Sequence, residues 1–159
     1  MSETIGLIFS AMLLLLVASG GLALFLYTKL RVSAARQSRI EPHGDAAHVP
    51  LVAAFSGWKG VPWIGWSSST LKPTLVLHPD HIECRVVRTR REPYTAVSRV
   101  DYRESIGTNN IVLEFSGSLS SFVGNTASRD LARDGILRLA RQGCPLSPRA
   151  EALLNGRSR

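Results

Sequence analysis

The first third of the chain is dominated by one uninterrupted apolar segment. Residues 5–27, IGLIFSAMLLLLVASGGLALFLY, contain no formal charge over 23 positions. As a helix this segment would measure about 35 Å, enough to cross the roughly 30 Å hydrocarbon core of a bilayer. No basic region precedes it, which argues against a cleaved signal peptide. The pattern therefore predicts a transmembrane helix over residues 5–27.

From about residue 57 the pattern becomes that of β-strands. Ile82, Cys84 and Val86 alternate with Glu83 and Arg85, which is the period of a half-buried strand. Similar short runs recur between turn residues, over 74–78, 81–87, 95–105, 111–115 and 118–125. Runs this short and regularly spaced predict an antiparallel meander.

The period then lengthens to that of a helix. From about residue 127 to 142, apolar side chains recur on one face and charged side chains mostly cover the other. Gly143 and Pro145 end this helix, and Ser147-Pro148 can begin a short second one. The sequence thus predicts one antiparallel sheet of five or more strands, closed by a C-terminal amphipathic helix.

This succession of elements resembles the bacterial pleckstrin-homology-like (PH-like) domains. The resemblance is carried by TLVLHPDHIECRVV (74–87), REPYTAVSRVDY (91–102), NNIVLEF (109–115), SFVGN (121–125) and SRDLARDGILRLARQG (128–143). It implies a curled β-sandwich or barrel capped at one end by the final helix, often found beside a transmembrane segment. Phosphoinositide-binding members use basic residues around the first hairpin. Here that hairpin turns at HPDH with no Lys ahead of it, so inositide specificity is not implied.

The expected fold class is an N-terminal transmembrane helix followed by an α+β or mainly-β domain with a PH-like antiparallel sheet. Four parts follow along the chain. They are a transmembrane helix (5–27), a basic linker containing Pro and Gly (28–56), a PH-like domain (57–143), and a short C-terminal helix with a tail (144–159).

The charge distribution predicts an orientation. The chain has 19 Lys+Arg against 12 Asp+Glu, and no Lys or Arg precedes Lys29. Four basic residues follow the apolar segment closely: Lys29, Arg31, Arg36 and Arg39. The positive-inside bias then predicts a single-pass protein of the bacterial inner membrane, with its N-terminus outside and its C-terminal domain in the cytoplasm. Near an anionic leaflet, each of these residues would gain about 1 kcal/mol.

Two further groups are candidates for contact with lipid. Arg88, Arg90 and Arg91 form a second basic cluster, which could equally be a solvated hairpin edge or a protein contact. All three tryptophans lie in GWKGVPWIGW, residues 57–66, where they either rest on a bilayer beside Lys59 or fill the end of the sheet. The full candidate surface is Lys29, Arg31, Arg36, Arg39, Trp58, Lys59, Trp63, Arg88, Arg90 and Arg91.

Catalytic and metal chemistry find little support. His78-Pro79-Asp80 matches the tripeptide of J-domains, but it lies between two β-patterned runs, where a turn accounts for it. His81 and Cys84 are three apart on a strand and so point to opposite faces, which disfavours a metal site. No phosphate loop, nucleophile triad or carboxylate pair is present, so no enzyme activity and no cofactor are expected. A cytoplasmic domain predicts free thiols at Cys84 and Cys144.

The predicted function is non-enzymatic binding at the inner membrane surface through anionic lipid headgroups. The alternative is a protein-interaction or assembly factor for an inner-membrane complex. Nucleic acid is not an expected partner, because aromatic residues are not interleaved with the basic ones outside residues 57–66. Small residues at Ser19 and Ala23 leave self-association open.

Overall fold

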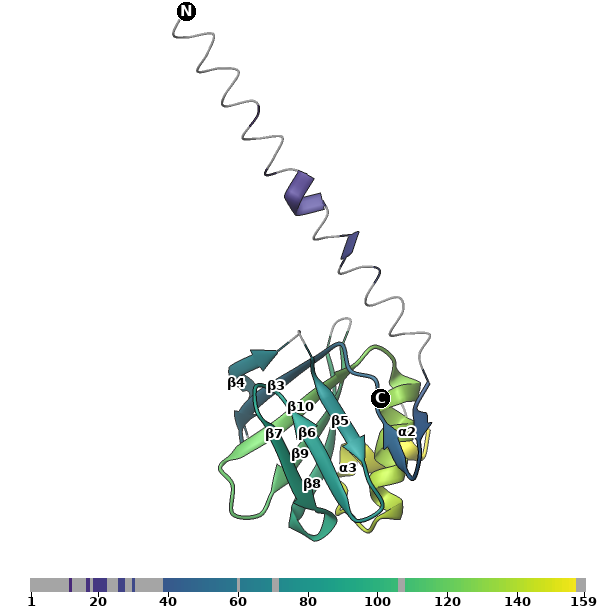
Figure 1. Ribbon diagram of the computed structural model, residues 1–159. Helices are drawn as coiled ribbons and strands as arrows, with labels where there is room; N and C mark the ends of the chain where they lie inside the picture. The colour runs from purple at the N-terminus through teal and green to yellow at the C-terminus, as the bar shows by residue number, and fades with distance from the viewer. Residues whose placement is uncertain are drawn as a thin grey trace, which may run out of the picture. The chain divides into compact units, whose positions relative to one another are not determined.

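The computed structural model describes residues 12, 17, 19–22, 26–27, 30, 39–59, 61–69, 72–105 and 108–156, with only the backbone for 41–43 and 61–69 (Figure 1). The chain divides into two compact units, Met1–Ala34 and Ala35–Arg159. The described residues of the first unit are helical. The second unit contains all the strands and the two helices described below.

Ten strands of the second unit form two five-stranded antiparallel sheets. The first sheet has the order β1 (Glu41–His43), β2 (Ala46–His48), β5 (Thr74–Leu77), β6 (His81–Arg85), β7 (Thr89–Pro93). The second has the order β4 (Val61–Ser69), β3 (Ala53–Trp58), β10 (Ser120–Thr126), β9 (Thr108–Phe115), β8 (Val97–Ser105). A short 3-10 helix, η1 (Tyr94–Ala96), joins β7 to β8.

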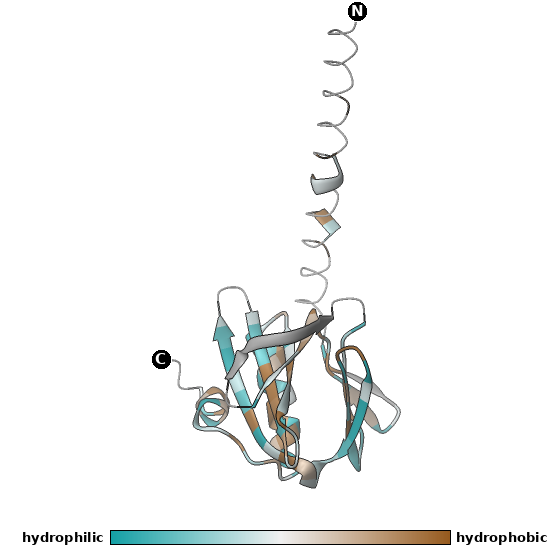
Figure 2. Cartoon of the chain, turned by 90° about the vertical axis from the view of Figure 1, so that its left-hand side faces the viewer, coloured by the Kyte–Doolittle hydropathy of each residue, from teal (hydrophilic) through white to brown (hydrophobic). Residues whose placement is uncertain are grey.

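The two sheets face one another across a single hydrophobic core (Figure 2). Alternate residues of the facing strands supply it, such as Leu75 and Ile82 from the first sheet and Leu113 and Phe115 from the second. Every buried residue of the described core lies between Ile40 and Leu153. The core is therefore contained within the second unit, which has what it needs to fold without residues 1–34.

Two helices complete the unit. α2 (Arg129–Arg141) begins at Ser128, whose hydroxyl accepts a hydrogen bond from the Leu131 amide at 3.2 Å. Its apolar face packs on β8, β9 and β10. At Gly135 a Cβ atom would lie 2.8 Å from Ile111 Cδ1, so glycine permits the close approach of helix and sheet.

The second helix, α3 (Pro148–Leu154), is held by its capping residue. Ser147 is 1% exposed, and its hydroxyl accepts a hydrogen bond from the Ala150 amide at 3.1 Å while donating to buried Asp101 on β8. Backbone bonds from Val100 N to Pro145 O (2.7 Å) and from Ser147 N to Val100 O (2.8 Å) fix the same segment to the edge of β8.

Ser147→Ala is expected to lower the free energy of unfolding by about 2 kcal/mol. The substitution removes a helix cap and leaves the Asp101 carboxylate without one of its buried donors. Chemical denaturation of residues 35–159 would measure it. Ser105→Ala, at an exposed position of β8, is the matched control, and equal stability of the two variants would contradict this role.

The structure corrects the predicted fold class at the sheet. Two packed antiparallel sheets replace the single sheet expected from the sequence. Four of the strands that the sequence did not predict, β1, β2, β3 and β4, come from residues 41–69, much of which the sequence reading assigned to a linker. β3 reads AAFSGW and β4 ends in SSS, and runs of such small residues give no hydrophobic alternation to detect.

The structure also corrects the membrane prediction. A spanning helix needs about 20 consecutive apolar residues, and within the described part of the chain no helix combines the length and hydropathy that crossing requires. Most of residues 5–27 lies outside the described positions. The predicted transmembrane helix is therefore not supported, and neither are the single-pass topology and bacterial inner-membrane location that depend on it.

Candidate functional site

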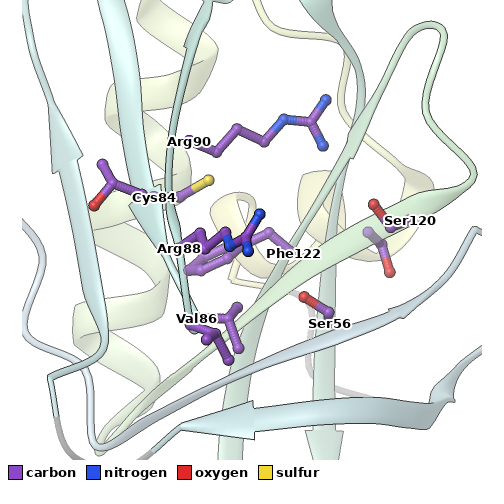
Figure 3. Close-up of a pocket in the computed structure, with 10 residues that line it drawn as sticks. Ser56, Cys84, Val86, Arg88, Arg90, Ser120 and Phe122 are labelled. Carbon is purple, nitrogen blue, oxygen red and sulfur yellow. The ribbon is translucent and has the colours of Figure 1, made fainter.

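A pocket of about 510 Å³ opens between the two sheets. Its lining comes from the second half of β6 through the start of β7, from β3 and from β10. These residues are Cys84, Val86, Val87, Arg88, Thr89 and Arg90 on one side, and Ser56, Ser120, Ser121 and Phe122 on the other (Figure 3). A volume of this size is typical of pockets that hold small organic ligands.

The floor of the pocket is apolar. Cys84, Val86 and Phe122 are each less than a tenth exposed, and all three belong to the hydrophobic core. Burial raises the pKa of the Cys84 thiol to about 12, so the thiol is neutral at physiological pH and acts as a small hydrophobic group. The floor therefore offers neither a charge nor a nucleophile.

The mouth of the pocket is cationic and hydroxyl-rich. Arg88 and Arg90 extend from the first sheet toward the second, where Ser56 and Ser120 present their hydroxyl groups (Figure 3). Arginine and hydroxyl groups together are suited to bind a phosphate or a carboxylate. The arrangement thus places anion-binding groups above an apolar floor.

The two arginines have different surroundings. Arg90 donates to Glu92 Oε1 at 2.8 Å and to Ser118 Oγ at 3.3 Å, and its guanidinium lies 4.3 Å from the ring centroid of Phe115. Its charge is thus compensated, and it ties β7 to the turn between β9 and β10. Arg88 is exposed, and no side chain in the described part of the chain forms an ion pair or hydrogen bond with it. Arg88 is the cation that remains available to an incoming anion.

Arg91 belongs to a different surface. Successive residues of a strand point to opposite faces, and Arg91 Nε donates to Glu83 Oε2 at 2.7 Å on the neighbouring strand. This hydrogen bond lowers the pKa of the Glu83 carboxyl below its usual value. The structure therefore separates Arg91 from Arg88 and Arg90, with which the sequence grouped it.

Three large apolar side chains are exposed around the mouth. Trp58, Val87 and Leu119 are 57%, 64% and 79% exposed, and we call them the apolar rim. Val87 lines the pocket, Trp58 is the cross-strand partner of Ser120, and Leu119 precedes Ser120. Each residue of the apolar rim thus lines the pocket or neighbours a lining residue in the sheet or along the chain.

The remaining predicted lipid contacts divide between described and undescribed positions. Lys59 is exposed and donates from Nζ to the Phe115 carbonyl oxygen at 3.3 Å, close to the apolar rim. Arg39 is exposed. Lys29, Arg31 and Arg36 lie outside the described residues, as do the side chains of Trp63 and Trp66 on β4.

Sequence reasoning missed the side of this site that the second sheet supplies. Ser56, Ser120 and Phe122 carry no distinguishing motif, and they meet Arg88 only because β3 and β10 pair in the second sheet and face the first. Leu119 did give a signal, since an apolar residue in a serine- and glycine-rich turn has no core to enter.

The histidine turn has a structural explanation. The His78 and His81 rings stack with centroids 4.3 Å apart, and the His78 amide donates to the His81 carbonyl oxygen at 2.9 Å. His81 Nδ1 lies 2.7 Å from Asp80 Oδ1. Across the described positions, no cluster of three or more His, Cys, Asp or Glu side chains could hold a metal ion. Cys84 and Cys144 are both buried free thiols.

The fold and the site together define a β-rich domain of two packed sheets whose pocket has a cationic mouth and an apolar floor. Comparison with models of protein families and with curated protein sequences finds no match to this chain. The functional argument therefore rests on the residues of the site.

Proposed function

We propose that residues 35–159 form a non-enzymatic binding module that docks on an anionic lipid surface, with the pocket mouth facing that surface. The observation that carries the proposal is the exposed Arg88 guanidinium, which is unpaired among the described side chains, lines the pocket and follows Val87 of the apolar rim. A phosphate in the mouth would give Arg88 its missing partner.

The apolar rim supports the same orientation. Tryptophan favours a position where one end of the ring system is apolar and the other is wet, and the headgroup region of a bilayer provides this. Trp58, Val87 and Leu119 would leave water when Arg88 reaches the headgroups. An exposed apolar cluster bordered by cations is the combination that peripheral membrane contacts require.

The proposal keeps the resemblance to bacterial PH-like domains. Its support is the pair of antiparallel sheets, with an amphipathic helix packed on β8, β9 and β10 near the C-terminus. It does not include a phosphoinositide preference, because the HPDH turn offers no lysine. Protein–protein contact through the apolar rim is the competing reading, and salt dependence distinguishes the two.

Arg88→Gln is expected to weaken binding to anionic vesicles about fivefold, because one interfacial Arg contributes about 1 kcal/mol near an anionic surface. Cosedimentation of residues 35–159 with phosphatidylglycerol-containing vesicles would measure this. Wild-type binding should fall steeply between low and high salt and be absent with phosphatidylcholine vesicles.

Arg91→Gln is the matched control, because it removes the same charge from the surface that carries Glu83. If the Arg88→Gln and Arg91→Gln variants lose the same affinity for anionic vesicles, net charge alone attracts the domain to the vesicle surface. Absence of vesicle binding by the folded wild-type domain would reject the proposal and leave the protein-interaction reading.

A further inference from the structure

The pocket is larger and has a more apolar lining than an anion requires. Arg88 at the mouth can hold an anion, yet the whole pocket measures about 510 Å³ and is also lined by buried Cys84, Val86 and Phe122. An inorganic anion would fill only a small part of this volume. A ligand with an apolar chain would fill the space beside these side chains, and its own apolar surface would leave water with a gain of about 25 cal/mol per Å².

The groups that line the pocket specify the ligand's chemistry. They are the exposed Arg88 guanidinium, the hydroxyl-bearing side chains of Ser56 and Ser120, and the buried apolar floor. A complementary ligand has an anionic head, a short polar connection and an apolar chain. Among the residues that the structure describes, Ser121 Oγ has no hydrogen-bond partner. Ser121 alternates with Ser120 and Phe122 along β10, so its side chain lies on the opposite face of the strand and is not part of this argument.

We infer that the pocket binds an anionic amphiphile, with the phosphate or carboxylate at Arg88 and a single apolar chain inserted between the two sheets. This inference rests on the proposed function, because the lipid surface would be the source of the amphiphile. The inference goes beyond surface docking because it places a ligand inside the domain. Surface docking alone would leave the interior of the pocket unused. A free fatty acid and a single-chain phospholipid share the required chemistry.

Arg90 would not bind the anionic head of the ligand, so the head would not pass deeper into the pocket than Arg88. Its guanidinium is held by Glu92, Ser118 and the Phe115 ring, so binding to it would require breaking existing contacts. The head is therefore held at Arg88, and the chain enters past Val86. Arg90 keeps β7 fixed to the turn that carries Leu119, which maintains the width of the entrance.

Three soluble probes test the inference by calorimetric titration of wild-type residues 35–159 below their micelle concentrations. Decyl phosphate carries both head and chain, inorganic phosphate only the head, and decyl maltoside only the chain. Decyl phosphate is expected to bind at least tenfold more tightly than either of the others. Decanoate should also bind if any anionic head suffices, whereas binding of decyl phosphate alone would identify a phosphate-specific mouth; both results support an anionic amphiphile. Equal affinities for inorganic phosphate and decyl phosphate would overturn the inference.

A cavity-filling variant supplies a second, independent test. Ser56→Phe places a ring in the pocket without changing any charge, and it should lower decyl phosphate affinity at least tenfold. Ser105→Phe, at an exposed position outside the pocket, is the matched control and should bind as wild type.

The outcomes separate the two proposals. Vesicle association without decyl phosphate binding would overturn the amphiphile pocket and leave surface docking intact. If the folded wild-type domain neither associates with vesicles nor binds decyl phosphate, both the surface docking and the amphiphile pocket are overturned. Unchanged decyl phosphate affinity in a folded Ser56→Phe variant would place the ligand elsewhere and also overturn the inference. If the variant does not fold, the comparison of probes on the wild-type domain decides.

Discussion

Residues 57–159 are expected not to fold, whereas residues 35–159 are expected to unfold in one cooperative transition. The shorter fragment lacks β1, β2 and four of the six residues of β3. β3 lies between β10 and β4, so its loss also detaches β4 from the second sheet. Val49 and Ala54, each fully buried, are removed from the core. A domain is stabilised by only about 5–15 kcal/mol, so the loss of this strand pairing together with part of the core is expected to prevent folding.

Thermal unfolding followed by far-ultraviolet circular dichroism distinguishes the two fragments. Residues 35–159 should give a single sigmoidal transition, and residues 57–159 should give none. A cooperative transition of residues 57–159 within a few degrees of the longer fragment would contradict the two-sheet architecture. It would indicate instead that the later strands form a complete sheet by themselves.

Alkaline pH is expected to destabilise the domain by several kcal/mol. Four buried or half-buried groups have raised pKa values, chiefly because burial disfavours their charged forms. Cys84, Tyr94 and Tyr102 reach about 12, and Cys144 reaches about 11. Each folded-state pKa exceeds its unfolded value, so this contribution is fully present below pH 9 and is lost as pH rises through 11 and 12. Each raised group lowers the unfolding free energy by about 1.4 kcal/mol per pH unit within its window.

Urea denaturation of residues 35–159 between pH 7 and pH 11 measures this loss. Stability should be nearly constant from pH 7 to 8.5 and fall steeply above pH 9. Cys84→Ala should reduce the steepness more than Cys144→Ala, because burial raises the pKa of Cys84 to about 12 and that of Cys144 only to about 11. Equal unfolding free energies at pH 7 and pH 11 would contradict the burial of these groups.

The later part of the fold could be predicted because its hydrophobic pattern is strong. The helix expected over 127–142 is α2, Arg129–Arg141, with Ser128 as its cap. The strand expected over 81–87 is β6, His81–Arg85, whose Ile82 and Cys84 are buried as the alternation required. These elements carry large side chains at the period of their own secondary structure, so the signal is local.

The earlier strands could not be predicted for a corresponding reason. β3 and β4 read AAFSGW and VPWIGWSSS, in which small residues outnumber the large apolar ones that would mark a face. Their pairing is also non-local, since β3 lies against β10 more than sixty residues later. β7 went unrecognised because TRREP combines three charges with a proline.

In the candidate site, too, some residues could be predicted from the sequence and others could not. Arg88 was identified from the sequence because charge is visible there. Its separation from Arg91 follows from strand alternation, which could be applied only once β7 was recognised as a strand. The apolar floor and the serines of the opposite sheet depend on which strands face each other, and neither composition nor spacing encodes that at these positions.

The central claim is that the mouth of the pocket, rather than the domain's general positive charge, contacts anionic lipid. Backbone amide shifts of residues 35–159, recorded while anionic lipid nanodiscs are added, test it most directly. The account predicts that the largest changes occur at the apolar rim and at residues 86–90 and 120–122, with little change around Glu83 and Arg91. Uniform changes over all basic surfaces, or changes confined to the Glu83–Arg91 face, would contradict it.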